Sequence, residues 1–170
     1  MAFWNKEIET MPRAELEKLQ LGLLKKQVRT MYDSSKLIHD RMKEAGLSPA
    51  DVTDLKSFHK LPFMKKTDFR DNYPDKLFLK PYEELVRVHV SSGTIGNPTI
   101  VGYTQKDMDD WAESLARGMV SFGMSNKDLI QNSHGYGLFT GGLGVHYAAE
   151  RIGATVLPTS TGGTEKQIRL

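Results

Sequence analysis

Residues 90–104, VSSGTIGNPTIVGYT, concentrate hydroxyl side chains and glycines between two segments rich in β-branched residues. Glycine permits positive φ and lets the main chain approach a ligand closely. Hydroxyls and successive backbone N–H groups can then converge on an anion. The stretch therefore predicts an anion-binding loop over residues 91–99, and a simple hairpin turn of small residues is the alternative.

This loop is not an ordinary P-loop. The GxxxxGK[ST] pattern is absent, because Gly93 is followed by Gly96 and then Asn97. No lysine or arginine lies within residues 91–99, so the loop brings no positive charge of its own. Lys66, in LPFMKK, is a hypothetical outside source of that charge, and a solvated surface lysine is the alternative.

A second constellation, NSHGYGLFTGG, occupies residues 132–142. It follows a segment expected to be a strand, which is where α/β folds place ligands. Further on, Gly142, Gly144 and Ala148 match a loose GxGxxxA dinucleotide pattern. That pattern neither begins right after a strand nor has an acidic residue after the next strand. Close packing of a helix against a sheet explains these small residues better.

Helices are expected to dominate the first 80 residues. Apolar side chains recur at helical spacing after Pro12 and again over residues 38–45, and Gly46 is a typical stop signal. Ser48 and Pro49 indicate the start of a short helix. Thr67 is expected to cap another short helix over residues 68–72. The region is interpreted as a helical layer that covers another part of the structure.

The character changes near residue 84. Residues 84–90 alternate, with valines on one side and Arg87 and His89 on the other, which indicates a half-buried strand, and residues 99–103 indicate a second strand. Thr104 with Asp107 resembles a capping box. The helix that follows is expected to end at Gly123 and to direct five large side chains inward: Met108, Trp111, Leu115, Met119 and Phe122.

Residues 128–132, 139–152 and 154–157 predict a βαβ-like unit, followed by a helix that starts at Glu165. The fold class is therefore α/β with an N-terminal helical layer. We expect a mainly helical region over residues 1–80. Residues 81–170 are expected to form an α/β part that is incomplete at its C-terminal side.

Composition excludes several classes of function. The chain has no cysteine, and its five histidines show no metal-ligand spacing, so no metal site is expected. A net charge of +2 on 170 residues gives no reason to expect nucleic acid as a partner. The N-terminus lacks a signal-peptide pattern and no apolar run is long enough for a bilayer, so we expect a cytoplasmic location and no membrane partner.

Three stretches resemble one family. SSGTIGNPTIVGYT looks like the phosphate-binding loop of adenylate-forming enzymes, commonly [ST]SGTTGxP, and its continuation is similar to phenylacetate–coenzyme A ligases. Residues 61–74 and 131–162 resemble the same ligases, in the same order. The α/β part is thus expected to be the start of the large N-terminal domain of an adenylate-forming enzyme.

The resemblance implies an acid–thiol ligase of aromatic catabolism. An aryl-acetic acid, by default phenylacetate, would react with ATP and Mg²⁺ to an acyl-adenylate, and coenzyme A would then displace AMP. The loop would bind the ATP phosphates through Ser91, Ser92, Gly93, Thr94 and Gly96. The acyl pocket would be lined by His134, Tyr136, Gly137 and Phe139, for which core packing, or a structural role for the histidine, is the alternative.

The resemblance also has gaps. Ile95 and Asn97 stand where the family usually has threonine and often has lysine. The family's adenine-binding segment and its C-terminal catalytic lysine have no counterpart, so the chain is expected to be a fragment without a catalytic residue. It would need a complementing C-terminal part or a second copy as a homodimer. A catalytically incomplete nucleotide- or anion-binding fragment, or a structural role, is the alternative function.

Overall fold

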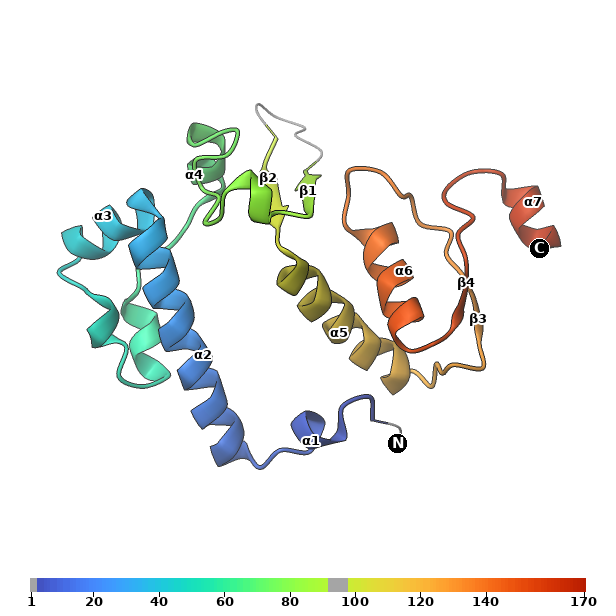
Figure 1. Ribbon diagram of the computed structural model, residues 1–170, viewed down its shortest axis with the longest axis horizontal. Helices are drawn as coiled ribbons and strands as arrows, with labels where there is room; N and C mark the ends of the chain where they lie inside the picture. Colours follow the sequence, from blue (N-terminus) through green and yellow to red (C-terminus); the bar gives the residue numbers. More distant parts are fainter. Residues whose placement is uncertain (1–2, 92–97) are drawn as a thin grey trace.

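The computed structural model describes residues 3–91 and 98–170. The first part of the chain is helical: α1 (Lys6–Glu9), α2 (Arg13–Ser34), α3 (Lys36–Glu44), the 3₁₀ turns η1 (Pro49–Asp51) and η2 (Lys56–Lys60), and α4 (Lys66–Asp71). A further 3₁₀ turn, η3 (Tyr82–Glu84), leads into the strands. Figure 1 shows α2 and α3 on one side, the strands with α5 (Gln105–Ser121) and α6 (Gly141–Arg151) on the other, and α1 near the lower end of α5.

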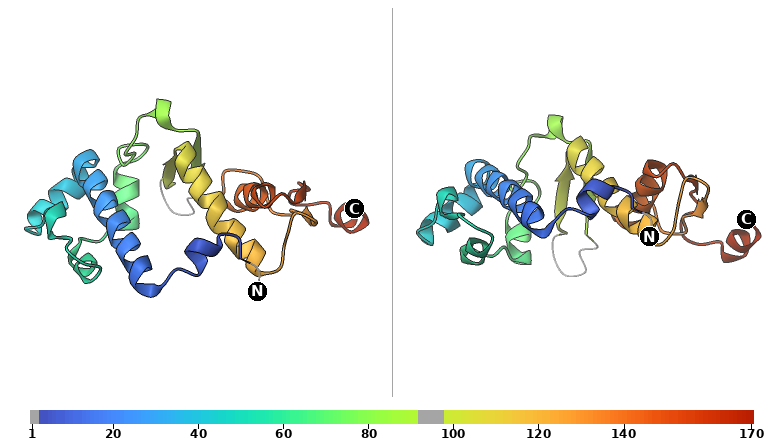
Figure 2. Two further views of the ribbon diagram at one scale, coloured as in Figure 1. Left: turned by 60° about the horizontal axis from the view of Figure 1, so that its bottom comes forward. Right: turned by 90° about the horizontal axis from the view of Figure 1, so that it is seen from below.

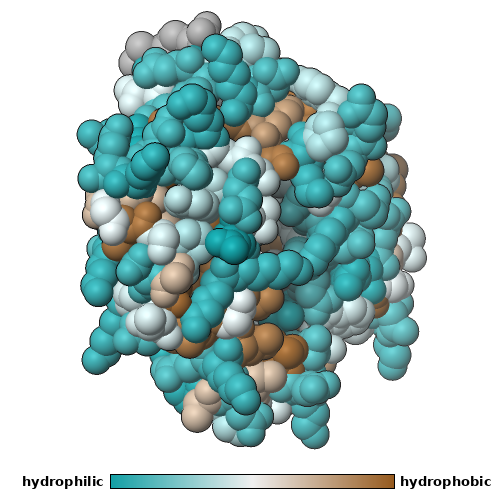
Figure 3. Space-filling model, turned by 60° about the vertical axis from the view of Figure 1, so that its left-hand side comes forward, coloured by the Kyte–Doolittle hydropathy of each residue, from teal (hydrophilic) through white to brown (hydrophobic). Residues whose placement is uncertain are grey.

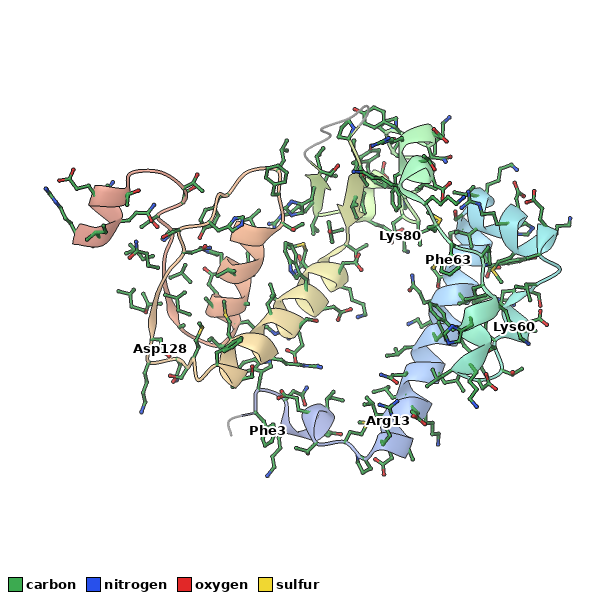
Figure 4. The ribbon with its side chains drawn as sticks, turned by 180° about the vertical axis from the view of Figure 1, so that it is seen from behind. Phe3, Arg13, Lys60, Phe63, Lys80 and Asp128 are labelled. Carbon is green, nitrogen blue, oxygen red and sulfur yellow. The ribbon has the colours of Figure 1, made fainter. Side chains whose placement is uncertain are left out.

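The helical side has its own hydrophobic cluster, formed by Val28, Ile38, Met42 and Val52. Helix α2 lies along α3 in all three ribbon views (Figures 1 and 2). The surface over these helices is mainly hydrophilic with scattered hydrophobic patches (Figure 3). One apolar hollow lies among α2, α3 and the chain after η2, beside Phe63 (labelled in Figure 4).

The α/β side contains two small sheets. Strand β1 (Arg87–Val90) pairs antiparallel with β2 (Ile100–Tyr103), with Val90 opposite Ile100. Strand β3 (Leu129–Gln131) pairs parallel with β4 (Thr155–Leu157), and α6 (Gly141–Arg151) connects them. The expected strand–loop–strand and βαβ-like units are thus both present, and α7 (Thr164–Arg169) follows.

Helix α5 (Gln105–Ser121) packs against α6, and the second hydrophobic cluster lies there: Ala116, Val120, Ala149, Ile152 and Ala154. The predicted capping box is confirmed, because Thr104 Oγ1 accepts from Asp107 N and Asp107 Oδ2 accepts from Thr104 N. The N-terminal segment closes onto α5, where Trp4 Nε1 donates to Glu113 Oε2 at 2.8 Å. Figure 1 shows α1 beside the C-terminal end of α5.

Two sequence-based expectations about helices were wrong. Thr67 does not cap α4, because the carboxylate of Asp68 accepts from Lys65 N at 2.5 Å and the helix starts one residue before Thr67. Phe122 does not point inward: it lies at the C-cap of α5 and is 87% exposed. The inward positions of the last two turns are taken by Ala116 and Val120.

Gly144 of α6 has a different partner from the expected sheet. A Cβ at Gly144 would lie 2.6 Å from the Trp111 ring and 2.8 Å from Leu115 Cδ1. Both side chains belong to α5, so the close approach is between two helices rather than between a helix and a sheet. The reason for the glycine is the bulk of the indole against which it packs.

Candidate functional site

Two hydrogen bonds join the ends of the 91–99 loop. Ser91 N donates to the Thr99 carbonyl at 2.9 Å, and Thr99 N donates to Ser91 Oγ at 2.8 Å. The Ser91 hydroxyl oxygen therefore helps to close the base of the loop. The other predicted phosphate-binding residues, Ser92, Gly93, Thr94 and Gly96, lie outside the described residues, as do Ile95 and Asn97.

The 132–142 loop is organised by Asn132, which is 4% exposed. Its Nδ2 donates to the Gly142 carbonyl and to the Tyr136 hydroxyl, both at 2.7 Å. Its Oδ1 accepts from His134 N at 3.2 Å. One buried amide thus fixes both ends of the loop and its centre. Sequence reasoning missed this residue, although its position directly after β3 was a usable signal.

Tyr136 lies at the start of a polar chain. Its hydroxyl accepts from Asn132 and lies 3.1 Å from His146 Nδ1, while His146 Nε2 lies 3.1 Å from Glu150 Oε1. The Tyr136 hydroxyl can therefore donate to Nδ1, with the imidazole proton on Nε2 facing the carboxylate. Burial raises the pKa of Tyr136 above its ordinary value. The phenol is thus held as a neutral hydrogen-bonding group.

The other predicted pocket residues are more open. His134 is exposed, and its ring covers the start of α6, where a Cβ at Gly141 would lie 2.7 Å from His134 Cε1. Gly137 and Phe139 are on the outer part of the loop, and Phe139 is exposed. The structure therefore brings His134, Tyr136, Gly137 and Phe139 onto one loop, with Tyr136 turned inward and Phe139 left accessible.

A single carbonyl joins the two constellations. Leu138 O accepts from Val90 N at 3.2 Å and from His89 Nδ1 at 2.9 Å. Val90 is the last residue before the 91–99 loop, and Leu138 lies between Gly137 and Phe139. The residues just before the predicted anion loop thus contact the middle of the predicted acyl loop. Neither His89 nor Leu138 was among the candidate site residues.

Lys66 is the first residue of α4 and is exposed. The same helix carries Asp68, whose carboxylate receives both terminal nitrogens of Arg41, at 2.7 and 2.6 Å. Asp68 therefore anchors α4 to α3. Over residues 3–91 and 98–170, no three His, Cys, Asp or Glu side chains gather into a group able to hold a metal ion.

No helix of the described chain has the length and apolar character needed to cross a lipid bilayer. Comparison with family models gave no match. The sequence is 49% identical over 163 residues to the phenylacetate-coenzyme A ligase of Escherichia coli, 48% to that of Pseudomonas putida and 46% over 167 residues to that of Thermus thermophilus. These matches cover 96–98% of this chain but only 37–38% of the relatives' length.

Solved structures of a CoA ligase also match this chain. The chain is 30% identical to 2-hydroxyisobutyryl-CoA ligase in an open conformation with 2-HIB-AMP and CoA, with a TM-score of 0.86 over 95% of this chain and 38% of the ligase. The thioesterification state of that ligase gives 31% identity and a TM-score of 0.87. The resemblance to phenylacetate-coenzyme A ligases is thus confirmed for the part of those enzymes that the chain spans, and so is the α/β fold class.

Proposed function

We propose that this chain supplies the phosphate-binding and acid-binding loops of an ATP-dependent acid–thiol ligase that acts on an aryl-acetic acid, with phenylacetate as the default substrate. The observation that carries the proposal is the shared Leu138 carbonyl, which receives N–H groups from the stem of the 91–99 loop. Adenylation needs the two substrates to meet, and this contact keeps their two candidate loops adjacent.

In the proposed reaction, a carboxylate oxygen of the acid attacks the α-phosphorus of ATP and pyrophosphate leaves. The thiol sulfur of coenzyme A then attacks the acyl carbon, the thiol proton is lost to solvent, and AMP leaves. The 91–99 loop would hold the β- and γ-phosphates through main-chain N–H groups and the hydroxyls of Ser91, Ser92 and Thr94. Mg²⁺ would arrive with the ATP phosphates as part of the substrate.

The aryl ring would lie against the 132–142 loop. Phe139 offers an accessible aromatic face, and Tyr136 a ring whose hydroxyl is already satisfied by Asn132 and His146. Gly137 leaves the main chain open to close approach. His134 would lie near the substrate carboxylate. Lys66 is proposed to add the positive charge that residues 91–99 lack.

A second candidate is a module that binds nucleotide without turnover. The observation in its favour is the absence of lysine and arginine from residues 91–99. In either case we propose a complementing chain or a second copy as a partner. This proposal is supported by large apolar side chains left exposed on the α/β side, including Leu129 of β3 and Ile168 of α7.

The proposal is tested with a chimera, in which this chain replaces the matching segment of the Escherichia coli relative. Phenylacetate-dependent ATP–pyrophosphate exchange, followed by formation of a coenzyme A thioester, is expected. A panel of phenylacetate, 4-hydroxyphenylacetate, indoleacetate and benzoate identifies the acid. ATP binding by the chain in calorimetry without exchange by the chimera would favour the binding module, and absence of both would refute both functions.

Lys66 is tested in the same chimera. Lys66→Glu is expected to raise the KM for ATP several-fold and to leave the KM for the acid unchanged. Lys60→Glu, at the end of η2, makes the same charge change at another exposed lysine and serves as the control (Figure 4 labels Lys60). An unchanged KM for ATP in Lys66→Glu would remove Lys66 from the site.

A further inference from the structure

We propose that His89 is a positioning residue, which holds the acyl loop in register with the phosphate loop through the Leu138 carbonyl. The inference rests on the proposed function, which assigns the 91–99 loop (the phosphate loop) to ATP and the 132–142 loop (the acyl loop) to the acid. The contact itself rests only on geometry: His89 Nδ1 lies 2.9 Å from Leu138 O, and the neighbouring Val90 N lies 3.2 Å from the same oxygen. Two donors on consecutive residues thus use both lone pairs of one carbonyl.

The His89 ring is fixed by its surroundings. It is 5% exposed and meets Tyr103 edge-on at 5.5 Å between centroids and Trp111 at 5.7 Å. Tyr103 belongs to β2 and Trp111 to α5, so the imidazole packs against both a strand and a helix. Because a carbonyl can only accept, Nδ1 must carry the proton. The contacts with Tyr103 and Trp111 hold the ring so that this N–H bond points at the Leu138 carbonyl.

The choice of histidine here has a cost that packing alone does not explain. Its Nε2 is buried and has no hydrogen-bond partner within residues 3–91 and 98–170. A phenylalanine would fill the same aromatic environment without burying an unsatisfied nitrogen. A donor at the Nδ1 position is what phenylalanine lacks. The structure therefore points to the hydrogen bond with Leu138, rather than the ring's bulk, as the reason for His89.

The functional consequence follows from the reaction geometry. The acid oxygen must lie within roughly 3–3.5 Å of the α-phosphorus for attack, and misplacement by about 1 Å can cost about a hundredfold in rate. Each loop can still bind its own ligand when the contact with Leu138 is broken. What is lost is the placement of one ligand relative to the other. Disruption should therefore lower kcat for adenylation much more than it changes either KM.

Two substitutions separate this role from simple packing. His89→Asn keeps a donor, because its amide nitrogen takes the position of Nδ1, but it loses the ring. His89→Phe keeps the ring and loses the donor. A positioning role predicts that the His89→Asn variant retains more function than the His89→Phe variant, whereas a packing role predicts the reverse order. His39→Phe is the matched control, since the His39 ring also contacts a tyrosine ring, that of Tyr32, and its Nδ1 lies 3.3 Å from the Tyr32 carbonyl, on the helical side.

The first measurement is amide hydrogen exchange at Val90 in the chain itself, without substrates. His89→Phe is expected to reduce protection of the Val90 amide about tenfold, as loss of one buried hydrogen bond predicts. His89→Asn should stay within about threefold of the unsubstituted chain, and His39→Phe should leave Val90 unchanged. Greater protection in His89→Phe than in His89→Asn would overturn the proposal.

The second measurement uses the chimera. His89→Phe is expected to lower kcat of adenylation at least about tenfold with both KM values within about threefold, and His89→Asn to restore most of the rate. If His89→Asn lowered kcat as much as His89→Phe does, the proposal would also be overturned. If the unsubstituted chimera shows no adenylation, the proposed function fails while the exchange experiment still decides whether His89 couples the loops.

Discussion

Asn132 Nδ2 lies 2.7 Å from the carbonyl oxygen of Gly142, and this bond joins the end of strand β3 to the first turn of helix α6. The same nitrogen donates to Tyr136, so the amide spans the whole loop between the two elements. The loop is therefore held from its inner side, while the side chains of Leu138 and Phe139 on its outer part are exposed.

Asn132→Ala is expected to lower the free energy of unfolding by about 2–3 kcal/mol, because it removes the side-chain partner of the buried Gly142 carbonyl and of the His134 amide. Chemical denaturation measures the change. Ser133→Ala is the control: it removes an exposed hydroxyl whose contact with Thr159 is 3.4 Å long, and should change stability by less than about 0.5 kcal/mol. Equal losses in the two variants would contradict the role assigned to Asn132.

Gly142→Ala is expected to be poorly tolerated. A Cβ at this position would lie 2.3 Å from the Gly135 carbonyl oxygen, a main-chain atom that cannot turn away. A loss of more than about 2 kcal/mol is expected, since the loop must shift to make room. Gly137→Ala, in the same loop, meets no described atom within 4 Å and should stay within about 0.5 kcal/mol. Thermal denaturation distinguishes them, and comparable midpoints would count against the close approach.

The Arg41–Asp68 pair predicts a stability that depends on acid pH. The hydrogen bond from Arg41, aided by the Lys65 amide, lowers the pKa of Asp68 from 3.8 to about 2. Because the carboxyl is more acidic in the folded chain, its stabilising effect is complete above the unfolded pKa and is lost as pH falls from about 4 to about 2. The melting temperature should fall through this window, and less so in the double variant Arg41→Met, Asp68→Asn.

Arg41→Met alone should lower the melting temperature by several degrees at neutral pH, because it leaves a buried carboxylate without its partner. Arg13→Met is the control, since the Arg13–Glu17 pair on α2 is solvent-exposed and contributes little. In the pH experiment, the double variant Arg41→Met, Asp68→Asn could instead lose as much melting temperature on acidification as the unsubstituted chain. That result would show that other groups dominate the acid transition.

Local sequence signals predicted the elements well where the structure depends on neighbouring residues. The Thr104–Asp107 capping box and the stop at Gly46, which has a φ of 67°, are set within one turn of helix. The predicted alternation in β1 also holds. The alternation does not reveal which side of the strand is buried. His89 is buried, whereas Val86 and Val88 are exposed.

The site residues that the sequence did not indicate are those defined by distant partners. Nothing local to His89 predicts a carbonyl 49 positions later, and nothing local to Asn132 predicts that its amide spans a loop. Phe122 shows the opposite case: helical spacing places it near the inner face, but the helix ends there and the side chain is left exposed. Tertiary contacts, rather than propensity, decide each of these positions.

The exposed side chain of Phe139 gives a direct test of the proposed acid-binding role of the 132–142 loop. Its side chain is 51% exposed, so Phe139→Ala should change stability by less than about 1 kcal/mol. In the chimera it should raise the KM for phenylacetate roughly five- to thirtyfold, the equivalent of about 1–2 kcal/mol of lost aromatic contact, and leave the KM for ATP unchanged.

Leu138→Ala is the matched control for Phe139, because it truncates the neighbouring exposed side chain and keeps the carbonyl that His89 and Val90 bind. If the loop holds the acid through the ring of Phe139, only Phe139→Ala should weaken phenylacetate, and Phe139→Tyr should retain most of the affinity. An equal rise of the KM in Leu138→Ala would mean that the outer loop acts through general apolar burial, and that Phe139 does not recognise an aryl ring.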